Sequence, residues 1–173
     1  MRALVVHESM FGNTETVARA VADGLVEAGA EVRVESVREA AADLGGVDLL
    51  VVGGPTHAFG MSRASTRADA VTKGATAEAA AGPGIREWID DLDPATTAVA
   101  CFDTRVRRPR VPGSAARAAR KRLRAKGLDA VGPATTFWVD GMDGPLVDGE
   151  AGRARRWGTE LAAAVSERSG TSR

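Results

Sequence analysis

The chain has no tyrosine, a single cysteine (Cys101) and only two histidines among its 173 residues. A single cysteine excludes an internal disulfide bond. So few histidine and cysteine side chains also argue against the common kinds of zinc site. No apolar run approaches the roughly 18 residues that a membrane span needs, and the first run, Ala3–Val6, is too short for a secretory signal. We therefore expect a cytoplasmic protein with neither a metal site nor a membrane anchor.

The formal net charge is zero, but the charge is unevenly distributed along the chain. Between residues 105 and 126 no acidic residue occurs, and ten are basic: Arg105, Arg107, Arg108, Arg110, Arg117, Arg120, Lys121, Arg122, Arg124 and Lys126. The other 13 basic residues face all 23 acidic ones, so the rest of the chain sums to −10. This segment therefore carries a positive field of its own.

Short apolar runs alternate with longer helical patterns along most of the chain, which predicts a parallel sheet with helices on both faces. We expect one domain over residues 1–168 and a frayed tail over 169–173. We expect Ser62–Pro83, which is rich in Ala, Thr and Gly, to be a long loop running into a helix. The predicted strands are Arg2–His7, Ala30–Val37, Val47–Gly54, Thr96–Phe102 and Thr135–Val139. The predicted helices are Asn13–Ala28, Gly84–Leu92, Ser114–Lys126 and Glu150–Glu167.

A polar segment, ESMFGNT, separates the first predicted strand from the first helix. Free backbone N–H groups and the helix dipole favour an anion there, and Gly12 allows close backbone approach. The segment has no lysine or arginine, which argues against a nucleoside-triphosphate loop, and it lacks the Gly-x-Gly-x-x-Gly pattern of dinucleotide folds. Asn13 and Thr14 are also good helix caps, so the segment alone leaves capping and anion binding equally open.

Two more unusual segments, GGPTHAFGMSR and FDTRVRRPR, follow the third and fourth predicted strands. The carboxyl ends of parallel strands meet at one edge of a sheet, where such folds bind their ligands. We therefore expect all three segments to converge on one site.

SMFGNTETVA resembles the phosphate loop of the flavodoxin family, in which Ser/Thr-x-x-Gly-x-Thr opens the first helix. GGPTHAF is similar to the family's second loop, Gly-x-Pro-Thr followed by an aromatic residue. The resemblance covers roughly residues 2–166 and is to flavodoxins of the short-chain type. It implies a doubly wound α/β three-layer sandwich with a five-stranded parallel sheet in the order 2-1-3-4-5. It also implies flavin mononucleotide (FMN) as the cofactor and a role in electron transfer.

The resemblance assigns the phosphate of FMN to the first segment. Met10 and Phe11 stand where the family often has hydroxyl residues, so backbone N–H groups would carry more of the binding. The residues concerned are Ser9, Met10, Phe11, Gly12, Asn13 and Thr14.

In the second segment, Thr56 matches the family's threonine, and His57 falls where many members place an aromatic ring against the flavin. Phe59 could cover that ring face instead, and Gly60 could let a peptide turn when the flavin is reduced. The cofactor-binding residues expected here are Pro55, Thr56, His57, Ala58, Phe59 and Gly60.

The third segment departs most from the family, which often has glycine, an acid and a tyrosine there. Phe102 could cover a flavin ring face or be the last core residue of its strand. Asp103 and Thr104 would offer backbone groups to the pyrimidine edge of the ring. Arg105 either stabilises a reduced, anionic flavin or belongs to the solvated basic run.

Three functions remain open from the sequence. We favour an electron carrier, whose residues Arg107, Arg108 and Arg110 would dock an acidic redox partner protein beside the flavin. The alternatives are an FMN-dependent reductase of quinone-type acceptors that uses NAD(P)H, and a flavodoxin-like interaction scaffold with weak or no flavin binding. The basic run is also explained by a solvated helix face, and its lack of interleaved aromatic residues argues against nucleic acid.

Overall fold

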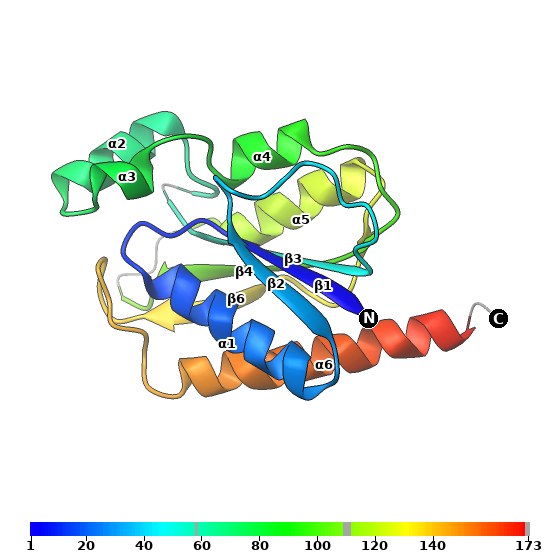
Figure 1. Ribbon diagram of the computed structural model, residues 1–173. Helices are drawn as coiled ribbons and strands as arrows, with labels where there is room; N and C mark the ends of the chain where they lie inside the picture. Colours follow the sequence, from blue (N-terminus) through cyan, green and yellow to red (C-terminus); the bar gives the residue numbers. More distant parts are fainter. Residues whose placement is uncertain (58, 109–111, 172–173) are drawn as a thin grey trace.

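The computed structural model describes residues 1–57, 59–108 and 112–171, and Figure 1 shows a central sheet between layers of helices. The strands are β1 (Arg2–His7), β2 (Glu31–Ser36), β3 (Leu49–Pro55), β4 (Ala98–Val106), β5 (Asp129–Ala130) and β6 (Thr135–Val139). The helices are α1 (Asn13–Glu27), α2 (Ala64–Thr72), α3 (Ala77–Ala80), α4 (Ile85–Asp91), α5 (Ala115–Ala125) and α6 (Glu150–Thr171).

The sheet is parallel, with the strand order β2-β1-β3-β4-β5, and this confirms the predicted fold class. The fifth position is divided between two short strands, where the sequence predicted one. β5 pairs with the start of β4 at Ala98 and Val99, and β6 pairs with its end, from Phe102 to Val106.

Helices cover both faces of the sheet, with α1 and α6 on one face and α4 and α5 on the other (Figure 1). Consecutive strand residues point to opposite faces. Val5 and Val51 join the cluster under α1 and α6, and Val6 and Val52 join the cluster under α4 and α5. Because both faces are buried, the central strands are continuous apolar runs, as the sequence suggested.

Helices α1 and α6 cross at two glycines, Gly24 and Gly158. A Cβ atom on Gly24 would overlap the carbonyl of Arg155, and one on Gly158 would overlap the carbonyl of Val21. The hydroxyl of Thr159 also donates a hydrogen bond to the Gly24 carbonyl, at 3.2 Å. Backbone therefore packs directly on backbone, and the two helices are locked together along their axes.

Strand β4 continues four residues beyond its predicted end at Phe102. Polar Asp103, Thr104 and Arg105 suggested a loop, but β6 lies alongside them and satisfies their backbone hydrogen-bonding groups. They are strand residues, so the prediction of a third loop beginning at Phe102 is wrong.

The expected loop over Ser62–Pro83 contains α2 and α3, which lie beyond the carboxyl edge of the sheet (Figure 1). Their sequence carries little apolar periodicity. Tertiary bonds fix α2 instead, because the buried guanidinium of Arg67 donates to Ser62, to Glu87 and to the carbonyl of Gly82. At the other end of the chain, α6 continues to Thr171, past its predicted end at Glu167. None of the helices in the described ranges is both long and apolar enough to cross a membrane.

Candidate functional site

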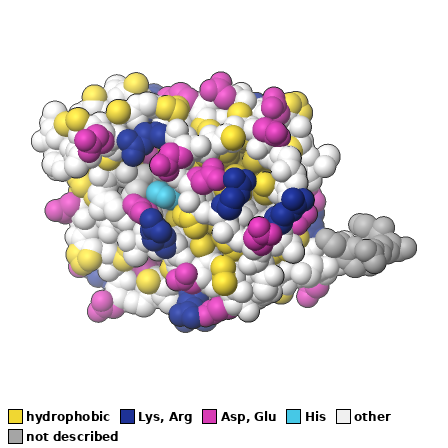
Figure 2. Space-filling view, viewed as in Figure 1, with side chains coloured by type: hydrophobic (Ala, Val, Ile, Leu, Met, Phe, Trp, Pro, Cys, Tyr) yellow, Lys and Arg dark blue, Asp and Glu magenta, His cyan; other side chains and the backbone are white. Residues whose placement is uncertain are grey.

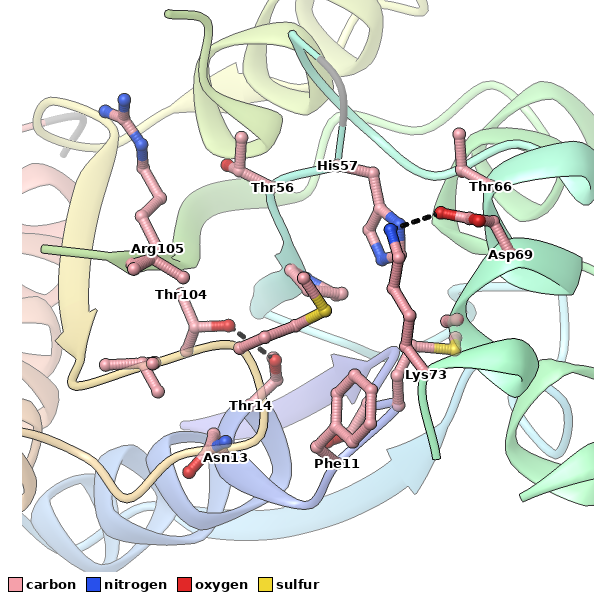
Figure 3. A pocket seen from close by; sticks show the side chains of 18 residues that line it. Phe11, Asn13, Thr14, Thr56, His57, Thr66, Asp69, Lys73, Thr104 and Arg105 are labelled. Carbon is pink, nitrogen blue, oxygen red and sulfur yellow. Dashed lines mark hydrogen bonds and ion pairs between the residues drawn. The ribbon is translucent and has the colours of Figure 1, made fainter. Parts of the chain in front are cut away.

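A pocket of about 290 Å³ opens at the carboxyl edge of the sheet, between the start of α1, the ends of β3, β4 and β6, and helix α2 (Figure 3). Its lining includes ten of the sixteen residues that the sequence predicted for the cofactor. These are Ser9, Met10, Phe11, Asn13, Thr14, Pro55, Thr56, His57, Thr104 and Arg105. The three chain segments therefore do converge, as expected for this edge of a parallel sheet.

The start of α1 is arranged to receive an anion. Gly12 is the N-cap, its φ is +85°, and no side chain caps the first amides of the helix. A Cβ atom on Gly12 would find no other atom within 4 Å, so the space beside the N-cap is open. The hydroxyl of Ser9 is buried and has no hydrogen-bond partner. Free amides, an unpartnered hydroxyl and a positive dipole end together fit a phosphate group.

The capping interpretation of this segment fails, because its two capping candidates bond elsewhere. The Asn13 amide donates to the carbonyl of Asp143 at 3.1 Å, and the Thr14 hydroxyl lies 2.8 Å from the Thr104 hydroxyl (Figure 3). These bonds hold the first turn of α1 against the end of β4 and against the segment that follows β6, and they leave the amides uncovered.

His57 stands on the side of the pocket formed by the end of β3 and α2 (Figure 3). Burial lowers the pKa of its imidazole, and the positive charges of Arg67 and Lys73 lower it further, so the ring is uncharged at neutral pH. Its backbone N–H and C=O both bond to Gly60, which closes a tight turn. In that turn Phe59 is 69% exposed with a φ of +74°, and neither Phe59 nor Gly60 lines the pocket. Ala58 lies outside the described residues.

Phe102 belongs to the core. It is 1% exposed, and its ring meets Phe137 and Trp157 edge-on at 5.9 and 6.1 Å between centroids. Gly53 on β3 makes room for it, since a Cβ atom there would overlap the ring. The prediction that Phe102 contacts the cofactor is therefore wrong, and the alternative of a last core residue is right.

The prediction that Asp103 offers groups to the cofactor is also corrected, because Asp103 is fully buried and does not line the pocket. Its carboxylate accepts hydrogen bonds from Thr56, Ser114 and Thr136 and from the amide of Ala116, at 2.6–3.1 Å. These donors come from the second loop, the start of α5 and β6. Asp103 therefore holds three elements together behind the pocket, while the next two residues, Thr104 and Arg105, line it.

Helix α2 and its C-cap supply a pocket wall that sequence reasoning missed, with Thr66, Asp69 and Ala70 on the helix and Lys73 at the cap. The Lys73 ammonium lies 2.6 Å from the Asp69 carboxylate, and Figure 3 shows this pair beside His57. Their spacing of four residues is a helix signal that could have revealed the element. Also missed were Val106, Val139, Gly141 and Met142, from the extension of β4 and from the end of β6 onward.

Among the described lining residues, the aromatic rings are those of Phe11 and His57. Opposite His57, Arg105 lies across the pocket (Figure 3), with its guanidinium 5.7 Å from the centre of the Trp138 ring. Cys101 is not part of the site, since it is 1% exposed and burial raises the pKa of its thiol to about 12. Within the described ranges no three or more His, Cys, Asp or Glu side chains gather to hold a metal ion.

Comparison with known proteins gives a family and a fold. The family model of flavodoxin matches residues 5–154. Among solved structures, a flavodoxin from the domain Archaea is similar at 20% identity, with a TM-score of 0.69 over 96% of this chain and 99% of that one. Oxidised Flavodoxin 2 from Bacillus cereus is similar at 18% identity, with a TM-score of 0.63 over 97% and 99% of the two chains. The Flv1 flavodiiron core from Synechocystis sp. PCC6803 is similar at 18% identity, with a TM-score of 0.64 over 97% of this chain and 36% of that one. No curated protein matches the sequence.

Proposed function

We propose that this chain, which belongs to the flavodoxin family, binds FMN in the pocket at the carboxyl edge of the sheet and acts as an electron carrier. The observation that carries this proposal is the uncapped start of α1, where Gly12 exposes the first amides beside the unpartnered Ser9 hydroxyl. A phosphate can be held there by backbone groups without a lysine, and the absence of a lysine points away from nucleotide hydrolysis.

The pocket then has two ends, which we call the phosphate end (Ser9–Thr14) and the ring end (Thr56, His57, Lys73, Thr104 and Arg105). Bound FMN supplies a ring system that takes up and releases electrons. The uncharged imidazole of His57 is suited to pack on such a ring, and the charge of Arg105 favours added negative charge nearby. Gly60, bonded to His57, stays our candidate for a peptide that turns on reduction.

We further propose that an acidic redox protein docks beside the ring end. Arg107 and Arg108 follow β4 directly, and the described side chain of Arg107 is 52% exposed, 3.7 Å from the Asp140 carboxylate. Arg110, the third predicted docking residue, lies outside the described residues. On α5, Arg117, Arg120, Lys121 and Arg124 line a groove to which no described acidic residue contributes. Such a surface attracts negative partners over about one Debye length, or ~8 Å at physiological salt.

A titration with FMN tests the cofactor. The purified protein should quench the fluorescence of added FMN stoichiometrically and become yellow, and it should bind riboflavin, which lacks the phosphate, much more weakly. A protein that leaves FMN fluorescence unchanged would refute flavin binding and favour the scaffold.

Two further measurements test the role. Reduction of an acidic redox protein should slow steeply as salt is added, and rates that are flat across ionic strength would exclude electrostatic docking. NAD(P)H alone should not reduce the loaded protein at a useful rate. Rapid oxidation of NAD(P)H with a quinone acceptor would refute the electron-carrier function and support the reductase.

A further inference from the structure

Helix α5 divides its basic side chains between two faces. Toward α4, Arg122 pairs with the Asp90 carboxylate, and Lys126 donates to the carbonyls of Asp90 and Leu92 at 2.6 Å. On another face the cations follow the spacing i, i+3, i+4 and i+7, and we call them the α5 stripe: Arg117, Arg120, Lys121 and Arg124. This spacing aligns the four side chains along about 10 Å of the helix axis.

The cations of the α5 stripe differ from those elsewhere on the surface in having no partner. Arg19 pairs with Glu15 and Arg33 with Glu35, and Figure 2 shows basic and acidic side chains next to one another on the face that it views. Within residues 1–57, 59–108 and 112–171, by contrast, no ion pair or side-chain hydrogen bond is formed by any of the four stripe cations. Their charge is therefore available to a molecule outside the chain.

The α5 stripe also opposes the helix that carries it. Arg117 and Lys121, like Arg120 and Arg124, are equal charges four residues apart, and such pairs destabilise a helix. Arg117 moreover stands near the start of α5, where the dipole is positive and no acidic residue occurs in the first turn. A row of acidic groups against this face would relieve both effects.

The surroundings of the α5 stripe restrict the class of partner. The stripe lines an open groove of about 610 Å³, together with Ala125 and with Pro133 and Ala134 from the segment between β5 and β6. No aromatic side chain is among the described lining residues, so nucleic-acid bases have no ring on which to stack. The apolar lining is small and lacks the bulky side chains that insert into a lipid surface. Uncharged, short side chains do allow another helix to approach closely, so the groove fits an acidic protein segment best.

We propose that the α5 stripe docks an acidic α-helix of the redox partner, with carboxylates at the same spacing of i, i+3, i+4 and i+7. Two α-helices share one rise per residue, so four carboxylates at this spacing face the four cations together. The Arg117 end of the stripe lies nearer the FMN pocket, because the N–H of Ala115 donates at 3.0 Å to the hydroxyl of Thr56, which lines that pocket. The docked helix therefore leads the partner toward the ring end. Its membership of a redox protein rests on the proposed function, whereas its docking on α5 does not.

A pair of synthetic peptides tests the spacing. Both are rhodamine-labelled, alanine-rich helices of about 20 residues with four glutamates. In the striped peptide the glutamates stand at i, i+3, i+4 and i+7, and in the control they are distributed around the helix. By fluorescence anisotropy with the full-length protein at low salt, the striped peptide should bind about tenfold more tightly than the control. Equal affinities would overturn the helix-to-helix match.

Substitutions on α5 test the site. The double variant Lys121→Gln/Arg124→Gln should weaken the striped peptide about tenfold. Its thermal stability should stay the same or rise, because it removes repulsion within the helix. Arg122→Gln removes the same charge from the same helix off the stripe, and it should change the affinity less than about twofold. An equal loss in Arg122→Gln would show a general positive field in place of a docking site.

Two other polyanions decide the class of partner. Oligouridine and phosphatidylserine vesicles should bind more weakly than the striped peptide, and tighter binding of either one would overturn the assignment to a protein helix. The peptide titration is run without and with FMN. Peptide binding by protein that fails to bind FMN would leave this inference standing, and protein that binds FMN but not the peptide would refute this inference alone.

Discussion

At the phosphate end of the pocket, Ser9–Thr14 offer mainly backbone amides from one turn of chain. At the ring end the contributions are side chains from separate parts of the fold: His57 follows β3, Lys73 is the C-cap of α2, and Arg105 lies on β4. The first construction needs a helix start and one glycine, and both are local in the sequence. The second needs β3, α2 and β4 to be brought together by the rest of the fold. Substitutions that change the local backbone conformation should therefore affect the phosphate end most. Substitutions that remove contacts between elements should affect the ring end most.

The largest effect should come from Asp103, the buried carboxylate behind the ring end. Asp103→Ala leaves the hydroxyls of Thr56, Ser114 and Thr136 without their acceptor. We expect a loss of about 3–4 kcal/mol in the free energy of unfolding, measured by urea denaturation.

Asp103→Asn is the matched control for this change. Its oxygen can take the three donors on one side, and its NH₂ can donate to the Thr136 hydroxyl, so the geometry is kept and only the charge is lost. It should cost less than half as much as the alanine variant. Equal losses from both would mean that the charge, and not the bonding pattern, organises this end.

The next effect distinguishes the phosphate end from the ring end by comparing FMN with riboflavin, which lacks the phosphate. Gly12→Ala places a side chain at φ +85°, which costs about 1–2 kcal/mol of backbone strain. The loop relieves this strain only by changing the backbone conformation that presents its amides to the phosphate. FMN affinity should fall about tenfold by fluorescence titration, while riboflavin affinity stays unchanged. Gly29, at the other end of α1, has φ +84° and equally open surroundings. Gly29→Ala should cost similar stability without any change in FMN affinity, and a shared loss of affinity would point to general destabilisation.

A smaller effect is expected at the ring end. His57→Ala removes one of the two aromatic rings described in the pocket lining, a contact of about 0.5–1.5 kcal/mol. FMN and riboflavin should weaken by the same factor, a few-fold, because the phosphate is not involved. Phe59→Ala should change neither, since Phe59 is exposed and outside the lining. A stronger effect at Phe59 than at His57 would reassign the stacking residue.

The smallest effect should be that of Lys73→Gln. The Lys73–Asp69 pair is roughly half exposed on both sides, and such surface pairs contribute about 0–1 kcal/mol. Thermal unfolding should shift by no more than a few degrees, and FMN affinity should stay within twofold. A large loss of FMN affinity with unchanged stability would show that Lys73 contacts the cofactor directly.

The same contrast explains what could be predicted from the sequence. Local patterns located β1, α1, α4 and the first loop, because Val17, Val21 and Leu25 repeat at helical spacing and Gly12 stands at the helix start. The end of β4 was missed, since buried Asp103 looks like a loop residue until its four donors are known. Helix α2 was missed for a related reason, because Arg67 anchors it through bonds to residues before and after it in the chain.

The direct packing of α1 on α6 has a consequence for the order in which this protein can mature during synthesis. The amides at the phosphate end are fixed by α1, and α1 is locked along its axis by Gly24 against Gly158. More than 130 residues separate the two glycines, so α1 leaves the ribosome long before its partner exists. The phosphate end lies within the first 14 residues, yet the firm hold on a flavin that we propose for it requires α6. A nascent chain should therefore acquire the cofactor only after α6 has been synthesised.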